Sequence, residues 1–465
     1  MKKSVLILLM ALSSSLFTIC EGQYKVLLNF DGANGNAPES GSLISSGKLL
    51  YGMTGNGGAF NDGNIFCIDT NGNGYRDLFD FNGSDGSNPN GGLILAGNKF
   101  YGTASMGGAN HLGCIFSIDT NGNGYKDLLD FNGTNGYGPG GSLIVSGKTL
   151  FGTTVDGGTL DSGVVFSIDT NGSNYKDLHD FTGGPNGENP YCTLLLSGGV
   201  LYGTASYINT GGAGCIFSLD SNGSNFKVLT DFNNIDGYEP FFGVILSGNT
   251  LYGTTTKGGP QDSGCIFSIN TSGSNFRDLF YFDGTNGDSP FGGLTLSGNI
   301  LYGMAGACAA HGFGCIYSIN ANGSNFVDLF DFSGLNGAFP VGNFINVGNA
   351  LYGMTSSGGT MDDGVLFSFK EAGLGIDNLT ASISSITIYP NLNNGVFTIQ
   401  SSVVSGQSSV EVYNMLGEKV YSNYQITKLS NYQINLSNQS NGVYLYHVLN
   451  ENGSLLGAGK LIIQK

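Results

Sequence analysis

The chain contains no tryptophan and only 4 histidines, and its 17 lysines and arginines face 34 aspartates and glutamates, giving a formal net charge of −17. Such an acidic surface disfavours nucleic acids and anionic membranes as partners. The histidines, at positions 111, 179, 311 and 447, lie at no spacing typical of a metal site. No serine nucleophile elbow, P-loop or dinucleotide-binding fingerprint occurs. The sequence therefore carries no motif of these enzyme classes.

Helical periodicity is also missing, as are long apolar segments after the N-terminus. No stretch of ten or more residues repeats its apolar positions with the period of an α-helix. No stretch after residue 22 is long and apolar enough to span a bilayer. These absences favour an all-β fold without a transmembrane anchor.

Cysteine is scarce, with 8 in the whole chain, of which 7 remain if residues 1–22 are removed. An odd number argues against a complete disulfide framework. One position of a repeated pattern holds a small residue that we expect to be buried, and four cysteines occupy it: Cys114, Cys215, Cys265 and Cys315. Equivalent positions in neighbouring sheets lie about 10 Å apart, too far for a bridge. Only Cys308 and Cys315 could pair, and we expect them not to.

Glycine, by contrast, is abundant, with 79 residues, and it is periodic. An aromatic residue precedes a recurrent glycine at steps of 50 or 51 residues: Tyr51, Tyr101, Phe151, Tyr202, Tyr252, Tyr302 and Tyr352. A fixed period of this length is typical of solenoids, propellers and other repeat arrays. Almost everything between residues 24 and 370 belongs to this repeat.

Each repeat contains four short apolar runs, which in the third copy are Ser142–Ser146, Lys148–Val155, Val164–Asp169 and Tyr175–Phe181. Tight turns rich in Gly and Asn separate the first run from the second and the third from the fourth. This pattern predicts a four-stranded antiparallel meander. Because such a sheet cannot bury both faces alone, we predict a seven-bladed, kelch-like β-propeller.

The fourth-strand pattern occurs once before the first complete repeat, at Tyr24–Phe30, and it does not follow the last set of strands, Asn343–Phe369. We therefore predict that the N-terminal strand completes the last blade. Closing the ring in this way would remove the free edges that an open array exposes.

The two ends of the chain differ from the repeats. Residues 1–22 resemble a secretory signal peptide, with Lys2 and Lys3 before an apolar stretch. The alternative, a lipoprotein signal ending at Cys20, ranks second because Ile19 is too large for that motif. Residues 23–370 form the propeller, 371–385 a linker, and 386–465 a set of alternating strands that predicts a small β-sandwich.

The C-terminal segment resembles the type A sorting domain of the type IX secretion system. The residues that carry this resemblance are Tyr389, Pro390, Asn391, Gly395, Asn414, Gly417, Gly442, Tyr444 and Lys460. Leu392 stands where the usual pattern has a second proline. The resemblance implies a Gram-negative bacterium of the Bacteroidetes kind and export across the outer membrane by the type IX secretion machinery. It also implies removal of this domain, and release or attachment at the cell surface.

The repeats resemble the GloVer tandem repeats of exported bacterial proteins, with the pattern LYGTT, then GG, then GxVFSID. The resemblance covers residues 24–370. It implies the class of protein and its export, and it implies no activity.

The one candidate metal site is a loop that occurs twice with oxygen-bearing side chains at regular spacing. Its residues are Asp69, Asn71, Asn73 and Asp77, and again Asp119, Asn121, Asn123 and Asp127. Oxygen ligands at positions 1, 3, 5 and 9 with glycine at position 6 suit Ca²⁺. The alternative is an Asn-Gly hairpin in which Asp and Asn hydrogen-bond the turn. No other cofactor is expected.

Two further carboxylate patterns favour a structural interpretation. Aspartates that precede the last aromatic of the fourth strand recur in five repeats, whereas catalytic acids are few and lie in contrasting environments; they are Asp80, Asp130, Asp180, Asp231 and Asp331. Thr159-x-Asp161-x-Gly163-x-x-Phe166 resembles the Asp-box turn of sialidase-like propellers. That resemblance implies a folding element outside the catalytic centre.

The leading hypothesis is a monomeric, non-enzymatic propeller that binds or displays a glycan or protein ligand at the cell surface. The alternatives are a secreted glycan-binding or glycan-active propeller and a purely structural spacer. Loops that differ between repeats are the best guess for contact residues, namely Tyr207–Asn209, Lys257 and Ala307–Phe313. A glycan hydrolase would require two carboxylates about 5–10 Å apart at one end of the channel.

Overall fold

We describe a computed structural model of the chain. The described residues are 24–38, 41–184, 187–206, 213–307, 311–370, 386–389, 392–401, 408–414, 419–426, 432–450 and 455–465. They form strands and no α-helix, so the part of the chain described here holds no helix that could cross a membrane. The predicted signal peptide (1–22) and linker (371–385) lie outside these residues. The chain divides into two compact units, Met1–Ala372 and Gly373–Lys465.

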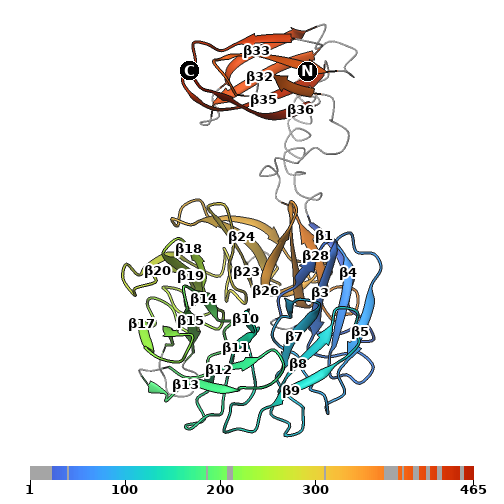
Figure 1. The fold of residues 1–465 in the computed structure, drawn as a ribbon, viewed down its shortest axis with the longest axis vertical. Coiled ribbons are helices and arrows are strands. Elements are labelled where there is room, and N and C mark those ends of the chain that lie inside the picture. Colours follow the sequence, from blue (N-terminus) through green and yellow to red (C-terminus); the bar gives the residue numbers. More distant parts are fainter. Residues whose placement is uncertain are drawn as a thin grey trace, which may run out of the picture. The chain divides into compact units, whose positions relative to one another are not determined.

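The described part of the first unit forms seven four-stranded antiparallel sheets (Figure 1). Six of them contain four consecutive strands each. These are β2(Ile44–Ser46) β3(Leu49–Thr54) β4(Asn64–Asp69) β5(Arg76–Asp80); β6(Ile94–Ala96) β7(Lys99–Ala104) β8(Cys114–Asp119) β9(Lys126–Asp130); β10(Ile144–Ser146) β11(Thr149–Thr154) β12(Val164–Asp169) β13(Lys176–Asp180); β14(Leu195–Ser197) β15(Val200–Ala205) β16(Cys215–Asp220) β17(Lys227–Asp231); β18(Ile245–Ser247) β19(Thr250–Thr255) β20(Cys265–Asn270) β21(Arg277–Tyr281); and β22(Thr295–Ser297) β23(Ile300–Ala305) β24(Cys315–Asn320) β25(Val327–Asp331).

The remaining sheet joins the two ends of the repeat region. It contains β26(Ala338–Val347), β27(Ala350–Ser357) and β28(Val365–Phe369), and its fourth strand is β1(Tyr24–Asn29). Tyr24 lies opposite Phe369, and the pairing shifts register between Val26 and Leu28. The same shift occurs between the third and fourth strands of the other six sheets. β1 therefore occupies the position of a fourth strand and has the same register shift as the other fourth strands.

Packing between sheets follows the same order. Six hydrophobic clusters each combine residues of two sheets that are neighbours in sequence, and a seventh cluster joins the last sheet to the first. In that cluster, Leu50 and Phe66 pack with Tyr352 and Leu366. The third strand is almost wholly buried because a neighbouring sheet covers each of its faces. The predicted all-β repeat fold is confirmed, and the closed seven-bladed ring stays our interpretation, which these contacts support.

An aromatic residue at the start of the fourth strand ties each sheet to the preceding one. Tyr24, Tyr75 and Tyr175 donate hydrogen bonds to the carbonyl oxygens of Asn336, Asn34 and Asn135, at 2.6, 2.8 and 2.6 Å, and Tyr125 makes the equivalent bond to Asp85. The rings also stack across the interface, as Tyr24 does on Phe330 with centroids 4.1 Å apart. The N-terminal strand thus makes the interface contacts of an internal repeat.

The second unit contains a three-stranded and a five-stranded sheet. The first has β29(Ile386–Tyr389), β31(Val396–Ser401) and β34(Tyr432–Asn435), and the second has β30(Leu392–Asn393), β36(Leu455–Ile463), β35(Gly442–Asn450), β32(Ser408–Asn414) and β33(Lys419–Ile426). Phe397 and Ile434 of the first sheet share one buried cluster with Val412, Tyr444 and Leu461 of the second. Two sheets that share a core in this way form a β-sandwich.

Candidate binding site at the centre of the first unit

The segments just before the first strand of each sheet meet at the centre of the first unit. Some of them approach one another so closely that they require glycine. A Cβ atom on Gly141 would lie 2.1 Å from the carbonyl oxygen of Cys192, and one on Gly91 would lie 2.7 Å from that of Gly141. The centre of the unit is therefore built largely from backbone, and a bulky residue there changes its shape.

Side chains just after these glycines bind the backbone of the preceding sheet. Each oxygen accepts an N–H hydrogen bond from the equivalent residue of that sheet. The bonds run from Gly92 to Ser142 Oγ (2.6 Å), Ser142 to Thr193 Oγ1 (3.0 Å), Gly293 to Asn343 Oδ1 (2.8 Å) and Asn343 to Ser42 Oγ (3.0 Å). Ser42 and Asn343 are 301 residues apart in sequence.

This arrangement leaves several hydrogen-bond donors at the centre without an acceptor among the described residues. The hydroxyls of Ser42, Ser142 and Thr193 each accept one N–H, so their own hydrogens remain available. The Asn343 side-chain NH₂ is available as well, since only its oxygen accepts a bond. All four residues are half-buried, so these donors are within reach of a ligand.

Three consecutive repeats place aromatic rings at the same centre, and we call Tyr191, Phe241, Phe242 and Phe291 the aromatic arc. The ring centroid of Phe241 lies 6.2 Å from that of Tyr191 and 6.3 Å from that of Phe291. Phe291 is 43% exposed. The Tyr191 hydroxyl reaches across to another sheet, where Asn90 Nδ2 donates to it.

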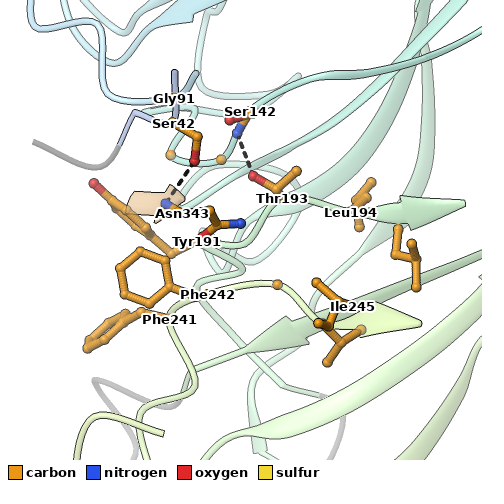
Figure 2. Close-up of a pocket in the computed structure, with 15 residues that line it drawn as sticks. Ser42, Gly91, Ser142, Tyr191, Thr193, Leu194, Phe241, Phe242, Ile245 and Asn343 are labelled. Atoms are coloured by element: carbon orange, nitrogen blue, oxygen red, sulfur yellow. Dashed lines mark hydrogen bonds between the residues drawn. The ribbon is translucent and has the colours of Figure 1, made fainter. Parts of the chain in front are cut away.

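Tyr191, Phe241 and Phe242 of the aromatic arc and the polar side chains line a cavity of about 170 Å³, which we call the central pocket (Figure 2). Its lining residues come from six of the seven sheets or their preceding segments: Ser42, Gly91, Gly140, Gly141, Ser142, Tyr191, Thr193, Leu194, Leu195, Phe241, Phe242, Gly243, Val244, Ile245 and Asn343. None of these is an acid, a lysine, an arginine or a histidine. The pocket can offer hydrogen bonds and ring faces, and it offers no general acid or base.

Charge is divided between the two ends of the sheets. We call the end with the connections from second to third strand and from each sheet to the next the loop face, and the other end the turn face. Lys257 is the only described lysine or arginine on the loop face. The described acidic residues there are Asp31, Asp62, Asp85, Asp156, Asp161, Glu188, Asp236, Glu239, Asp262, Asp283, Asp288, Asp362 and Asp363.

Most basic side chains lie on the turn face, where several hold neighbouring sheets together. The Nζ atoms of Lys25, Lys126 and Lys227 donate to the carbonyl oxygens of Asn71, Asn171 and Ser272, at 2.7, 2.8 and 2.8 Å. The loop face therefore repels anions, and the turn face uses part of its positive charge in the fold.

A second hollow, of about 630 Å³, lies on the loop face between the loops after β5 and β7. Its lining includes Asn82, Ser84, Met106 and His111. Met106 is 53% exposed, and His111 adopts a left-handed backbone with φ of 59°. The hollow has fewer convergent polar groups than the central pocket, so we do not assign a ligand to it.

The structure separates the calcium candidates of each loop into two places. Asp69 ends β4, and its carboxylate accepts the N–H groups of Asn71 and Asn73, both at 2.8 Å, which lowers its pKa. Asp77 lies on β5 opposite Phe66, and its carboxylate accepts a bond from Asn64 Nδ2 at 3.3 Å. Asp69 therefore serves the turn, while Asp77 belongs to the body of the sheet.

The second copy repeats this separation. Asp119 accepts a bond from Lys99 Nζ at 2.7 Å, and Asn121 Oδ1 accepts the N–H of Asn123 at 3.0 Å. Asp127 lies on β9 opposite Phe116. Among the described residues, no three His, Cys, Asp or Glu side chains gather as a metal site would require. A calcium site at either loop stays a prediction of the sequence.

The recurrent aspartates at the end of the fourth strand close the loop that carries the Gly-Gly pair. Asp80, Asp130 and Asp180 accept the N–H groups of Ala59, Ala109 and Thr159, at 2.9, 2.8 and 3.1 Å. In the last sheet Asn29 of β1 accepts the N–H of Thr360 at 3.0 Å. The three aspartates thus have a structural role.

Each of these aspartates also lies beside a second carboxylate. Partial desolvation and the charge of Asp130 raise the pKa of Asp127 to about 6. The same causes raise the pKa of Asp177, beside Asp180, to about 6. These pairs lie on the fourth strands, away from the central pocket.

The remaining candidate residues have local roles. Asp161 accepts the N–H of Gly157 at 3.0 Å, so the Asp-box resemblance corresponds to a turn. His179 stacks on Phe226 with centroids 3.6 Å apart, and burial lowers its pKa. His111 and His311 are exposed loop residues.

The cysteine prediction is wrong at one position. Cys114, Cys215 and Cys265 are free and buried, as expected, and burial raises the pKa of Cys114 and Cys265 to about 12. Cys315 is in a disulfide, so the expectation that it stays unpaired is wrong. The distance between neighbouring sheets excluded bridges among the four equivalent positions, and it placed no limit on a bridge from Cys315 to another part of the chain.

In the second unit the described sorting-motif residues support the sandwich. Gly395 has φ of 100°, and a Cβ there would lie 2.6 Å from Ser437 Cα. Tyr444, on β35, is buried and donates to the carbonyl of Ser440 at 2.9 Å. Tyr389, Asn414, Gly442 and Lys460 lie in or at the start of strands, whereas Pro390, Asn391 and Gly417 lie outside the described residues.

Sequence reasoning missed the central pocket. Its guesses were Tyr207–Asn209, which lie outside the described residues, Ala307–Phe313, of which 308–310 do too, and Lys257, whose Nζ donates to Ser289 Oγ at 3.1 Å. A signal was present, since an aromatic residue follows the recurrent proline in three consecutive repeats, at Tyr191, Phe241 and Phe291, and in none of the other four.

The fold and the second unit together define an all-β repeat protein with a secretion sorting domain. The Gloeobacter/Verrucomicrobia repeat family matches residues 13–214, 81–248 and 197–406, and the secretion system C-terminal sorting domain matches residues 387–464. The chain belongs to the Gloeobacter/Verrucomicrobia repeat family. Its sorting domain marks it as exported by type IX secretion to the cell surface or beyond.

The solved structures that resemble this chain include one with a TM-score of 0.50, which supports the fold alone, and others with lower scores. The GH74 enzyme of Niastella koreensis is 14% identical with a TM-score of 0.50, over 94% of this chain and 67% of that one. An oligogalacturonate lyase of Vibrio parahaemolyticus is 11% identical with a TM-score of 0.48, over 75% and 93%. TolB of Acinetobacter baumannii is 15% identical with a TM-score of 0.38, over 60% of this chain and 62% of TolB. No curated protein matches the chain.

Proposed function

We propose that this exported protein is a non-enzymatic binding protein and that the loop face around the central pocket is its binding surface. We also propose that its first unit is a closed seven-bladed propeller, residues 23–370, followed by a linker and a removable sorting domain. The observation that carries the binding role is the composition of the central pocket, which combines aromatic rings with neutral hydrogen-bond donors.

The distribution of exposed apolar side chains supports the loop face as the binding surface. Most large hydrophobic residues that are exposed in the first unit lie on that face: Phe60, Met106, Leu160, Ile235, Phe291, Phe313, Leu335, Phe339 and Met361. Leu95 and Val327 are the exceptions. Exposed apolar side chains concentrated on one face are typical of an interaction surface.

A glycan-active enzyme is less well supported. A glycoside hydrolase needs two carboxylates that flank the scissile bond, and no residue that lines the central pocket is acidic. The carboxylates with a raised pKa, such as Asp127 beside Asp130, lie on the fourth strands. A purely structural spacer would leave the central donors and the aromatic arc without a use.

The test is thermal unfolding of the protein against a panel of sugars, peptides and cell-wall fragments, with mass spectrometry of each mixture. A ligand at one hundred times its Kd stabilises by about 2.7 kcal/mol. With an unfolding entropy of about 2.1 cal/mol/K per residue, this raises the Tm of a unit of about 350 residues by about 4 °C. We expect such a rise in Tm for at least one ligand, and we expect mass spectrometry to detect no reaction product of that ligand.

Three results separate the hypotheses. Product formation would show an enzyme and overturn the proposal. A Tm rise that survives Phe241→Ala and Phe60→Ala alike would place binding away from the loop face. No rise with any member of the panel would favour the structural spacer.

A further inference from the structure

The central pocket carries an inference about the class of ligand, which rests on the proposed function. We propose that the central pocket binds a single neutral sugar ring, such as the end residue of a surface glycan. The four arguments are its two chemically different walls, its size, its charge and the hydrogen bonds that it leaves unmade.

The pocket has an apolar wall and a polar wall facing the same space. Tyr191, Phe241 and Phe242 supply ring faces, and Ser42 and Asn343 supply polar groups to the same space (Figure 2). A pyranose ring has the same division, because its C–H groups form apolar faces and its hydroxyls form a polar edge. Aromatic rings can cover such a face while a polar wall holds the edge.

The size of the pocket suits a small ligand such as one sugar ring. Its volume of about 170 Å³ is below the 300–1,000 Å³ or so typical of pockets for drug-sized ligands. Phe291, 43% exposed at the end of the aromatic arc, would contact the next residue of a chain.

The charge around the pocket favours a neutral sugar over a uronic or sialic acid. No lining residue is basic, and the loop face carries thirteen described acidic residues against Lys257 alone. An anionic sugar would therefore meet repulsion without a compensating ion pair.

The unused donors distinguish a sugar from an apolar peptide side chain. The hydroxyls of Ser42, Ser142 and Thr193 and the amide of Asn343 can each donate to a ligand oxygen. A hydrophobic side chain would bury these groups without partners, and an unpaired buried donor costs about 1–3 kcal/mol. A sugar hydroxyl can accept from them and donate in turn.

The experiment is titration calorimetry of the full chain with five neutral disaccharides, namely cellobiose, maltose, lactose, xylobiose and mannobiose. Digalacturonic acid and the tripeptide Ala-Phe-Ala serve as charged and apolar probes. We expect at least one neutral disaccharide to bind, and digalacturonic acid to bind at least tenfold more weakly than it. Phe241→Ala should weaken binding at least fivefold.

Two variants keep the result independent of folding defects. Phe291→Ala changes an exposed ring, so it should fold normally, and we expect it to weaken disaccharide binding about two- to fivefold. Phe60→Ala changes a ring that is 61% exposed on the same face and does not line the pocket. We expect its affinity to equal that of the wild type.

The outcomes separate this inference from the proposed function. Binding of the tripeptide or the acid in preference to every neutral sugar, lost in Phe241→Ala, would overturn the sugar assignment and leave the binding function standing. The absence of a measurable heat of binding with every neutral disaccharide at 50 mM would also overturn the sugar assignment. Equal losses in Phe60→Ala and Phe241→Ala would remove the central pocket as the site. No response to any probe in calorimetry or in the wider thermal panel would overturn both proposals.

Discussion

Closure of the first unit by the N-terminal strand can be tested at a single side chain, Tyr24. Its ring lies 4.1 Å from that of Phe330 and 5.1 Å from that of Phe367, and its hydroxyl donates to the carbonyl of Asn336 at 2.6 Å. Tyr24→Ala removes both the stacking and the hydrogen bond between β1 and the preceding sheet. The perturbation therefore acts directly on the contact that would hold the two ends of the repeat region together.

The expected loss follows from the burial of this ring. Replacing a buried aromatic residue by alanine costs about 3–5 kcal/mol, and Tyr24 is half-buried, so we expect about 3 kcal/mol. At about 2.1 cal/mol/K per residue, the unfolding entropy of a unit of about 350 residues is about 0.7 kcal/mol/K. Tyr24→Ala should therefore lower the Tm by about 4 °C in scanning calorimetry.

Two further variants make the measurement specific. Tyr24→Phe keeps the stacked ring and loses one hydrogen bond, worth about 1 kcal/mol, so its Tm should fall by only about 1–2 °C. Tyr75→Ala makes the equivalent change at an internal interface, and its loss should match that of Tyr24→Ala. A Tm for Tyr24→Ala within 1 °C of the wild type, with a clear loss for Tyr75→Ala, would refute closure through β1.

Three other outcomes follow from titratable side chains. His179 has a lowered pKa where it stacks on Phe226, so its neutral form is favoured in the folded state and stability should be lost as pH falls below about 6.5. His179→Leu should reduce the fall in Tm between pH 7.5 and 5.5, and equal falls would contradict this. Asp127, beside Asp130, has a pKa raised to about 6, so the folded state holds its proton more strongly and stability falls as pH rises from about 4 to 6. Asp127→Asn should raise the Tm at pH 8, and the gain in the free energy of unfolding should be less than about 1 kcal/mol because Asp127 is exposed. A gain of the same size at pH 4 would argue against charge repulsion as the cause. Because the carboxylate of Asp69 already accepts two N–H groups, we expect the Tm in EDTA and in millimolar Ca²⁺ to agree, and a rise of several degrees would establish a metal site.

Local chemistry explains why so much of the fold could be predicted. A turn such as Thr170-Asn171-Gly172 needs positive φ at glycine, and Gly172 has φ of 87°. The four strands predicted around it became β10 to β13 with ends shifted by a few residues. Each of these features depends on neighbours within about 50 residues, so it is visible in the order of the residues.

The central pocket depends on a different kind of information. Ser42 and Asn343 are 301 residues apart, and they meet because every sheet directs the same segment to one centre. Whether a side chain there fills the space or lines it depends on its neighbours from other repeats, such as Asn90 beside Tyr191. The same holds for Asp69 and Asp77, which are close in sequence but serve a turn and a strand.

The sequence by itself therefore determined the repeat, the meander, the role of the first strand and the export signal at the C-terminus, because each is encoded in local spacing and turn chemistry. Only the tertiary structure decided which side chains share the central pocket and that Cys315 is in a disulfide. Those outcomes depend on the separation of atoms from distant parts of the chain, and that separation exists only after the sheets have packed together.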